Sequence, residues 1–276
     1  MPELPEVEAA RRLLEPAMLD ARFMRVLLRR ANLRRAFPDR FSERLTGATV
    51  LAVGRRAKYL HLPLSTGDVL VMHLGMSGDF RVERIDDEAA PIVPPGLHDH
   101  VVFEMSSGCA VTFNDPRRFG TMDLLTPHPD GRHATVPGLG PEPLSDDFDA
   151  AALAQACARR KAPLKNTLLD QRVVAGLGNI YVVEALHRAG LSPRRRSSTI
   201  ATPSGKPRPT ATKLTQAIKA VLRRAVERQL APSYRASRFQ VYDREGEACP
   251  TGGCDGTIRR IVQAGRSTFY CPACQR

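Results

Sequence analysis

The spacing of four cysteines near the end of the chain constrains the fold more than any other feature. Cys249 and Cys254 enclose four residues, Cys271 and Cys274 enclose two, and sixteen residues separate the two pairs. Four thiolates on two short knuckles can hold one Zn²⁺ ion tetrahedrally, and the metal then replaces a hydrophobic core that so short a segment cannot form. Two disulfides are the alternative, which a reducing cytoplasm disfavours. The spacing predicts one structural zinc ion bound by all four cysteines.

The basic residues are concentrated in one part of the chain. The 276 residues carry a formal net charge of +12, and segment 155–240 holds 18 Lys and Arg against three acidic residues. Such a surplus favours a polyanionic partner, because each phosphate that a basic side chain neutralises releases condensed counterions. A solvated charged surface is the alternative that charge alone leaves open.

Hydrophobic patterning divides the chain into a β-rich half and a helical half. Residues 5–18 repeat apolar side chains at helical spacing, and residues 50–125 contain short β-prone runs that fit an antiparallel sandwich or barrel. Segment 127–143 is rich in proline and glycine, which predicts a linker. Helices are expected after it, at residues 148–160, 163–170, 180–189 and 211–228. The expected fold is α+β and multidomain, with domains at residues 1–130, 131–240 and 241–276.

The sequence contains no targeting or membrane signal. No stretch approaches the roughly 20 apolar residues of a membrane span, and the N-terminus lacks the basic and apolar regions of a secretory signal. We expect a cytoplasmic, nucleoid-associated monomer without a membrane partner.

Six blocks of sequence, distributed along the whole chain, resemble formamidopyrimidine-DNA glycosylase. The blocks are PELPEVE at 2–8, RRAKYL at 55–60, HLGMSG at 73–78, DPRRFG at 115–120, GLGNIYVVEAL at 176–186 and AGRSTFYCPACQR at 264–276. The resemblance implies an N-terminal β-sandwich with an N-terminal helix, a helical helix-two-turns-helix domain and a C-terminal zinc-finger hairpin. It also implies a bifunctional DNA glycosylase and AP lyase of base-excision repair, with damaged double-stranded DNA as its partner.

The resemblance assigns the chemistry to the start of the chain. Once Met1 is removed, the secondary amine of Pro2 is partly unprotonated near neutral pH and can attack the sugar carbon that bears the damaged base. The resulting iminium draws electrons, so that β- and δ-elimination follow. By resemblance, Glu3 is the general acid/base, Glu6 supports it, and Lys58 contacts the DNA near the lesion and assists catalysis. Capping of a helix N-terminus is the alternative for both glutamates.

The resemblance also assigns residues that contact the DNA. Met76 and Arg117 fill the void left by the extruded base, and Phe119 wedges between the bases opposite. The residues assigned to the kinked DNA backbone are His98, Asn179 and Arg266. Without the resemblance, Met76 and Phe119 would be assigned to the hydrophobic core.

Two segments depart from the family pattern. The first cysteine knuckle has four intervening residues where the family usually has two. Segment 225–240 is short and lacks the Gly-rich start of the family loop that closes over an extruded oxidised purine. The resemblance, with its PELPEVE start, implies oxidised purines as substrates, 8-oxoguanine and formamidopyrimidines. The short segment instead favours the alternative, an endonuclease VIII-like enzyme for oxidised pyrimidines or abasic sites. A non-catalytic damaged-DNA-binding protein is the alternative of another class, which Pro2, Glu3 and Lys58 disfavour.

Overall fold

The computed structural model describes residues 2–85, 96–126, 136–230 and 239–276. The chain divides into two compact units, Met1–Pro137 and Gly138–Arg276. The predicted domain limit at residues 130 and 131 lies outside the described residues, as does the first half of the predicted linker, residues 127–135. The predicted domain limits therefore stay predictions.

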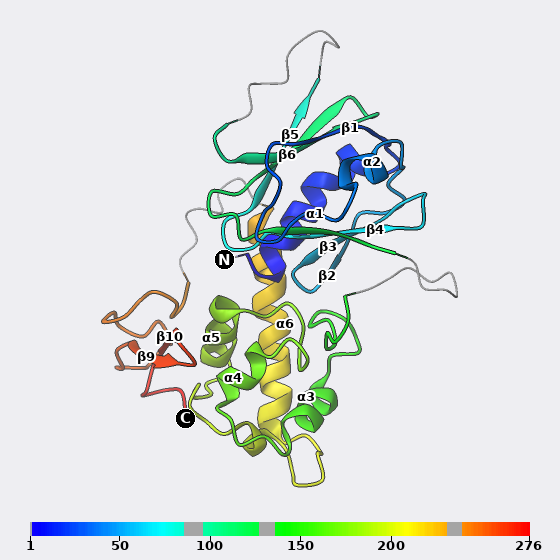
Figure 1. The fold of residues 1–276 in the computed structure, drawn as a ribbon. Coiled ribbons are helices and arrows are strands. Elements are labelled where there is room, and N and C mark those ends of the chain that lie inside the picture. Colours follow the sequence, from blue (N-terminus) through cyan, green and yellow to red (C-terminus); the bar gives the residue numbers. More distant parts are fainter. Residues whose placement is uncertain (1, 86–95, 127–135, 231–238) are drawn as a thin grey trace. The chain divides into compact units, whose positions relative to one another are not determined.

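The first unit is a sandwich of two four-stranded antiparallel sheets (Figure 1), with strand orders β1-β6-β7-β5 and β2-β3-β4-β8. The strands are β1 (Phe23–Leu28), β2 (Gly54–Arg56), β3 (Tyr59–Pro63), β4 (Val69–His73), β5 (Asp79–Arg84), β6 (Asp99–Met105), β7 (Cys109–Asn114) and β8 (Thr121–Leu125). Alternate side chains point inward, as in Leu60 and Leu62 of β3, and the two inner faces share one hydrophobic core.

Two helices accompany the sheets of the first unit, α1 (Leu4–Met18) and the short α2 (Phe41–Leu45). Helix α1 lies at residues 4–18 where 5–18 were predicted, and it buries Val7, Ala10 and Leu14 in the sandwich core. Its C-terminal end is fixed to the turn between β6 and β7, because the Ser107 hydroxyl donates to the Ala17 carbonyl at 2.7 Å. The core thus sets the position of the helix that carries the N-terminus.

The β-prone run at residues 50–64 forms two strands, β2 and β3, joined by a tight turn at Ala57 and Lys58. Ala57 has a φ of 54°, a left-handed conformation that a β-branched residue would adopt only with strain. The Arg55 guanidinium donates to the Ala57 carbonyl at 3.0 Å and stabilises the turn. Lys58 therefore lies at a strand connection instead of within a strand.

The second unit is helical with a small hairpin near its end. Its elements are α3 (Ala150–Cys157), α4 (Leu164–Leu169), α5 (Asn179–Arg188), the 3₁₀ turn η1 (Ser197–Ile200), α6 (Pro209–Gln229), β9 (Arg259–Gln263) and β10 (Arg266–Tyr270). Each predicted helix is present within about two residues at each end, apart from α3, which ends three residues early. None of the helices among the described residues is long and apolar enough to cross a membrane.

The prediction of an α+β multidomain fold is confirmed: a β-sandwich with an N-terminal helix, a helical domain and a cysteine-bearing hairpin follow one another along the chain (Figure 1). Strands β9 and β10 pair antiparallel between the two cysteine knuckles. Buried side chains around them, including Ile258 and Phe269, form a cluster separate from the sandwich core.

Candidate active site and DNA-binding residues

The N-terminus is held by the first turn of α1. Glu3 is the N-cap residue. In a capping box, the backbone N–H of Glu3 donates a hydrogen bond to the carboxylate of Glu6 at 2.9 Å. The Glu3 side chain is 1% exposed, whereas Pro2 is partly exposed. The capping contact orients the peptide that follows Pro2, so the two glutamates and Pro2 lie together at the start of α1.

The turn that carries Lys58 is attached to the same helix. Arg55 of β2 pairs with Glu8 of α1 at 3.2 Å, and both side chains are largely buried. Burial alone would raise the pKa of Glu8, but hydrogen bonds from Arg12 and Arg11 and the positive charges of Arg11 and Arg55 lower it. Lys58 itself is 9% exposed. A buried ion pair thus joins the Lys58 turn to the helix of Pro2, Glu3 and Glu6.

His73 is a functional candidate that the sequence reasoning did not name, although it begins the HLGMSG block. Burial, together with the positive charges of Lys58 and Arg34, lowers the pKa of His73 to about 4. Its Nδ1 accepts the Gly75 backbone N–H at 3.0 Å, so the proton of the neutral ring is on Nε2. Near neutral pH the pair Lys58 and His73 therefore offers an ammonium and an imidazole N–H, both suited to phosphate oxygens.

Asp115, which is fully buried, holds together the two loops that carry Met76, Arg117 and Phe119. One carboxylate oxygen accepts the Ser77 hydroxyl at 2.6 Å, and the other accepts the Gly120 N–H at 2.7 Å. The loops are in such close contact that a Cβ at Gly75 would collide with the backbone of Phe119. Their shape is therefore set by buried polar contacts and close backbone packing.

The side chains that these loops carry are half-exposed. Met76 and Phe119 are each 38% exposed, which differs from the core location expected without the resemblance. The guanidinium carbons of Arg117 and Arg34 lie 5.1 Å and 5.6 Å from the centroid of the Phe119 ring. The carbonyl of His98 accepts the Asp115 N–H at 2.9 Å, so His98 adjoins the same loop. A half-exposed aromatic ring with two cations near it can enter a base stack beside DNA phosphates.

In the second unit, the start of α5 meets the hairpin at Ser267. The Asn179 amide donates to the Ser267 carbonyl at 2.9 Å, and the amide retains a second N–H for a phosphate. The buried ammonium of Lys165 approaches the same carbonyl at 3.4 Å and donates to Thr268 Oγ1 at 2.6 Å. Burial and the charge of neighbouring Arg266 lower the pKa of Lys165 to about 8. Asn179 thus contacts the carbonyl group of Ser267, the residue that directly follows the exposed Arg266 in the chain.

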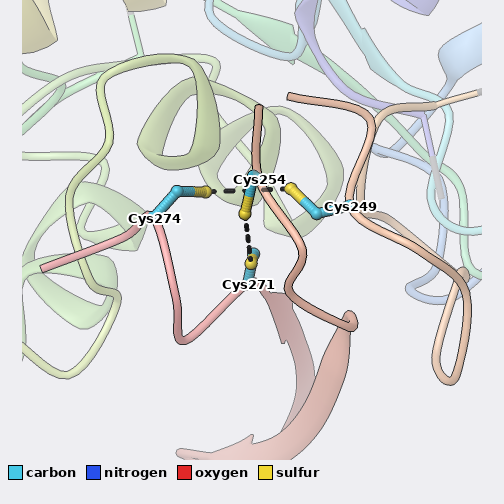
Figure 2. A group of neighbouring side chains, drawn as sticks. All are labelled: Cys249, Cys254, Cys271 and Cys274. Carbon is cyan, nitrogen blue, oxygen red and sulfur yellow. Dashed lines mark hydrogen bonds between the residues drawn. The ribbon is translucent and has the colours of Figure 1, made fainter. Parts of the chain in front are cut away.

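The four cysteines converge as their spacing predicts (Figure 2). All four sulfurs lie within 4.8 Å of one another, and the pairs Cys249–Cys274 and Cys254–Cys271 are each 3.7 Å apart. Tetrahedral zinc with Zn–S bonds of about 2.3 Å requires sulfurs roughly 3.8 Å apart, so the group fits one zinc ion. A Cβ at Gly256 would lie 2.5 Å from Cys271 Sγ, so this position requires glycine. All four ligands come from the protein, and the metal role is structural.

The proposed site residues thus form one set in each unit. The N-terminal turn, Lys58, and the loops of Met76, His98, Arg117 and Phe119 belong to the first unit. Asn179, Arg266 and the four cysteines belong to the second.

Comparison with known proteins decides the family. Three family models match in order: the formamidopyrimidine-DNA glycosylase N-terminal domain over residues 1–122, its H2TH domain over 139–234, and the zinc finger found in FPG and IleRS over 246–276. The chain belongs to the formamidopyrimidine-DNA glycosylase family. It is a DNA glycosylase of base-excision repair, and its finger holds one zinc ion through Cys249, Cys254, Cys271 and Cys274.

Relatives of this family match over the full length. Formamidopyrimidine-DNA glycosylases of Bradyrhizobium sp. BTAi1 and Beijerinckia indica are 55% and 53% identical, with 100% of both chains covered in each case. The solved structure of the Lactococcus lactis enzyme, non-covalently bound to DNA containing an AP site, superposes with a TM-score of 0.82 at 30% identity and covers 99% of both chains. The Thermus thermophilus enzyme superposes with a TM-score of 0.79 at 36% identity, covering 99% of this chain and 98% of that one.

Proposed function

We propose that this glycosylase excises oxidised purines through a covalent intermediate on Pro2 and then nicks the strand. The unprotonated Pro2 nitrogen attacks the sugar carbon C1′ as the C1′–N bond breaks, and the base leaves with the proton that the nitrogen loses. The C1′–O4′ bond then breaks, O4′ takes a proton, and the nitrogen lone pair forms a cationic iminium. Loss of a proton from C2′ expels the 3′ phosphate, a second elimination expels the 5′ phosphate, and water releases the sugar fragment from Pro2. Removal of Met1, which lies outside the described residues, is a condition of this reaction.

The observation that carries the proposal is the rigid N-terminal turn. A nucleophile is effective when it is held at a fixed position, and the capping contact between Glu6 and the Glu3 N–H restricts the peptide next to Pro2. We assign proton transfer at the sugar to Glu3, whose carboxyl group directly follows the Pro2 nucleophile in the chain. We assign to Glu6 the supporting role of holding that turn.

We propose that Lys58 and His73 together bind the phosphate next to the lesion. The neutral state of His73, which burial and the charges of Lys58 and Arg34 favour, supports this assignment, because the neutral ring still donates one N–H to a phosphate oxygen. Asn179 and Arg266 are assigned to further backbone phosphates, as is His98. The neighbouring positions of Asn179 and Arg266 about Ser267 support a shared phosphate region.

We propose that the loops held by Asp115 stabilise the extruded state of the DNA. Phe119, flanked by Arg34 and Arg117, inserts between bases, and the two guanidiniums attract the flanking phosphates. Met76 and Arg117 occupy the space that the damaged base leaves. The exposed fraction of Met76 and Phe119 supports these roles, because both side chains can reach a ligand.

The preference for purines is supported by relatives named formamidopyrimidine-DNA glycosylase and by the PELPEVE start. The alternative, an endonuclease VIII-like preference, is favoured by the short segment 225–240, of which residues 231–238 lie outside the described residues. We further propose that the enzyme acts as a cytoplasmic, nucleoid-associated monomer. Light scattering after size exclusion tests the oligomeric state.

One experiment tests chemistry and lesion class together. The protein is incubated with duplexes that carry 8-oxoguanine, formamidopyrimidine, thymine glycol or an abasic site, with borohydride present to reduce the iminium. We expect covalent adducts with the first two and with the abasic site. Adducts mainly with thymine glycol would establish the endonuclease VIII-like alternative. Binding without any adduct would overturn the catalytic proposal.

A further inference from the structure

The zinc-binding cysteines have a neighbour outside the finger. His187 lies in the last turn of α5 and is 9% exposed. Its Nε2 lies 3.1 Å from the Thr251 hydroxyl and 3.6 Å from Cys249 Sγ. Thr251 is inside the first knuckle, and its hydroxyl lies 3.9 Å from Cys274 Sγ. One imidazole therefore reaches two of the four zinc ligands, the first directly and the second through a hydroxyl group.

The chemistry of the ligands fixes the direction of these hydrogen bonds. A zinc-bound cysteine is a thiolate and can only accept. The His187 Nε2 must therefore carry the proton that points to Cys249 and Thr251, and the Thr251 hydroxyl in turn donates to Cys274. Four thiolates around Zn²⁺ leave a net charge of about −2, and N–H and O–H donors stabilise this charge where protein excludes water.

The same helix holds the finger through two further residues. Val183, one turn before His187, packs in the cluster that contains Cys249 and Cys271. The buried Glu184 carboxylate accepts the backbone N–H groups of residues 240, 241 and 242 at 2.9, 2.8 and 3.0 Å, just before the finger begins. Helix α5 is thus in position to restrain the first knuckle, whose four intervening residues make it longer than the second.

We propose that His187 is a positioning residue of the zinc centre, which donates to the Cys249 thiolate and to Thr251, keeps the long first knuckle closed and slows the loss of zinc. The helical domain thereby stabilises the metal site from outside the finger. The proposal is independent of the reaction at Pro2, because it concerns only the retention of the metal.

The test measures zinc release from the full-length, zinc-loaded protein. Excess chelator removes the metal, and a chromogenic indicator reports the rate. We expect His187→Phe, which has no donor, to release zinc about 10- to 100-fold faster than the unmodified protein. His187→Gln, whose amide can place an N–H near the position of Nε2, should restore a rate close to the original. Equal rates for the phenylalanine variant and the unmodified protein, or equally fast release by both variants, would overturn the proposal.

A second pair of variants decides the question if His187→Phe fails to fold. Thr251→Val removes the hydroxyl at nearly constant volume, and Thr251→Ser keeps it. We expect faster release only for the valine variant, and a normal rate for that variant would refute the hydrogen-bonded chain. In the Co²⁺-substituted protein, the thiolate-to-metal charge-transfer band should shift in His187→Phe and not in Arg188→Gln, a control at the exposed next position of α5. An unshifted band in the phenylalanine variant would assign to His187 a packing role only.

Discussion

The two units of this glycosylase fix their functional side chains by different means. In the first unit, a hydrophobic core shared by two sheets and α1 supports loops that buried carboxylates, such as Asp115, hold in place. In the second unit, a zinc centre and polar contacts from α4 and α5 hold the hairpin that carries Arg266. The chemistry proposed at Pro2 should therefore be separable from the metal-dependent binding of DNA.

Each unit also buries a basic group next to other positive charges, with different results. The pKa of His73 falls to about 4, so the imidazole is neutral near pH 7. The pKa of Lys165 falls only to about 8, so its ammonium remains mostly charged there. The first unit thus gains a neutral donor beside Lys58, and the second gains a buried cation that binds the hairpin backbone.

The largest expected effect comes from the nucleophile. Pro2→Gly should lower base excision by on the order of 1,000-fold or more, because the reaction loses its covalent intermediate, although a new terminal glycine amine can react weakly. DNA binding should remain close to normal. The measurement combines single-turnover excision, borohydride trapping and a binding titration.

The matched control is Pro5→Ala, which changes a proline in the same helical turn and leaves the terminal amine intact. It should keep near-normal excision. If borohydride trapped Pro2→Gly as efficiently as the unmodified protein, another amine would be the nucleophile. The proposed separation of chemistry at Pro2 from DNA binding by the second unit would then be unsupported.

The second expected effect lies in the zinc centre. Cys271→Ser should lose the metal and weaken DNA binding by about 100-fold, which corresponds to the loss of two hydrogen bonds to charged groups, those proposed for Asn179 and Arg266. Metal analysis and a binding titration measure both changes. Cys109→Ser, a half-buried cysteine of the first unit, should change neither. Normal DNA affinity in a metal-free Cys271→Ser protein would show that the hairpin contributes little to binding.

The sequence predicted those features that depend on local spacing. The cysteine spacing predicted the zinc site, and the 3.6-residue repeat of apolar side chains predicted the helices, because both signals lie within one short segment. The β2–β3 turn was missed, because the left-handed backbone of Ala57 has no signal in a residue that is not glycine. The β-prone pattern therefore runs through Lys58, which the structure places in the turn.

Contacts between distant segments could not be predicted. Nothing in the residue pattern joins His187 to Thr251, or Ser77 to Asp115, since these pairs meet only through tertiary packing. Met76 and Phe119 have large apolar side chains of the kind usually found in a core. Only the resemblance predicts that they contact DNA at the surface. The roles of the individual site residues stay predictions, as does the role of segment 225–240.

The third expected effect tests how the first unit holds its loops. Asp115→Asn should lower the free energy of unfolding by about 3 kcal/mol, because an amide cannot accept both the Ser77 hydroxyl and the Gly120 N–H. Urea unfolding followed by circular dichroism measures the change. Asp39→Asn, at an exposed position, should have little effect. An unchanged stability of the Asp115 variant would mean that backbone packing alone sets the loops.

The smallest expected effect is a difference in acid stability caused by His73. An imidazole in the unfolded chain takes up its proton near pH 6.5, whereas the folded chain resists protonation until about pH 4, owing to burial and to the charges of Lys58 and Arg34. Between these values the unfolded state binds more protons, so the free energy of unfolding falls as the pH falls.

His73→Asn keeps an acceptor for the Gly75 N–H and removes the titration. Relative to its own value at pH 7.5, this variant should therefore lose about 2 kcal/mol less than the unmodified protein at pH 5. Thermal unfolding across this range measures the difference, with His61→Asn of the neighbouring strand β3 as the control. Parallel curves for the unmodified protein and His73→Asn would show that His73 is not the group that makes the first unit sensitive to acid.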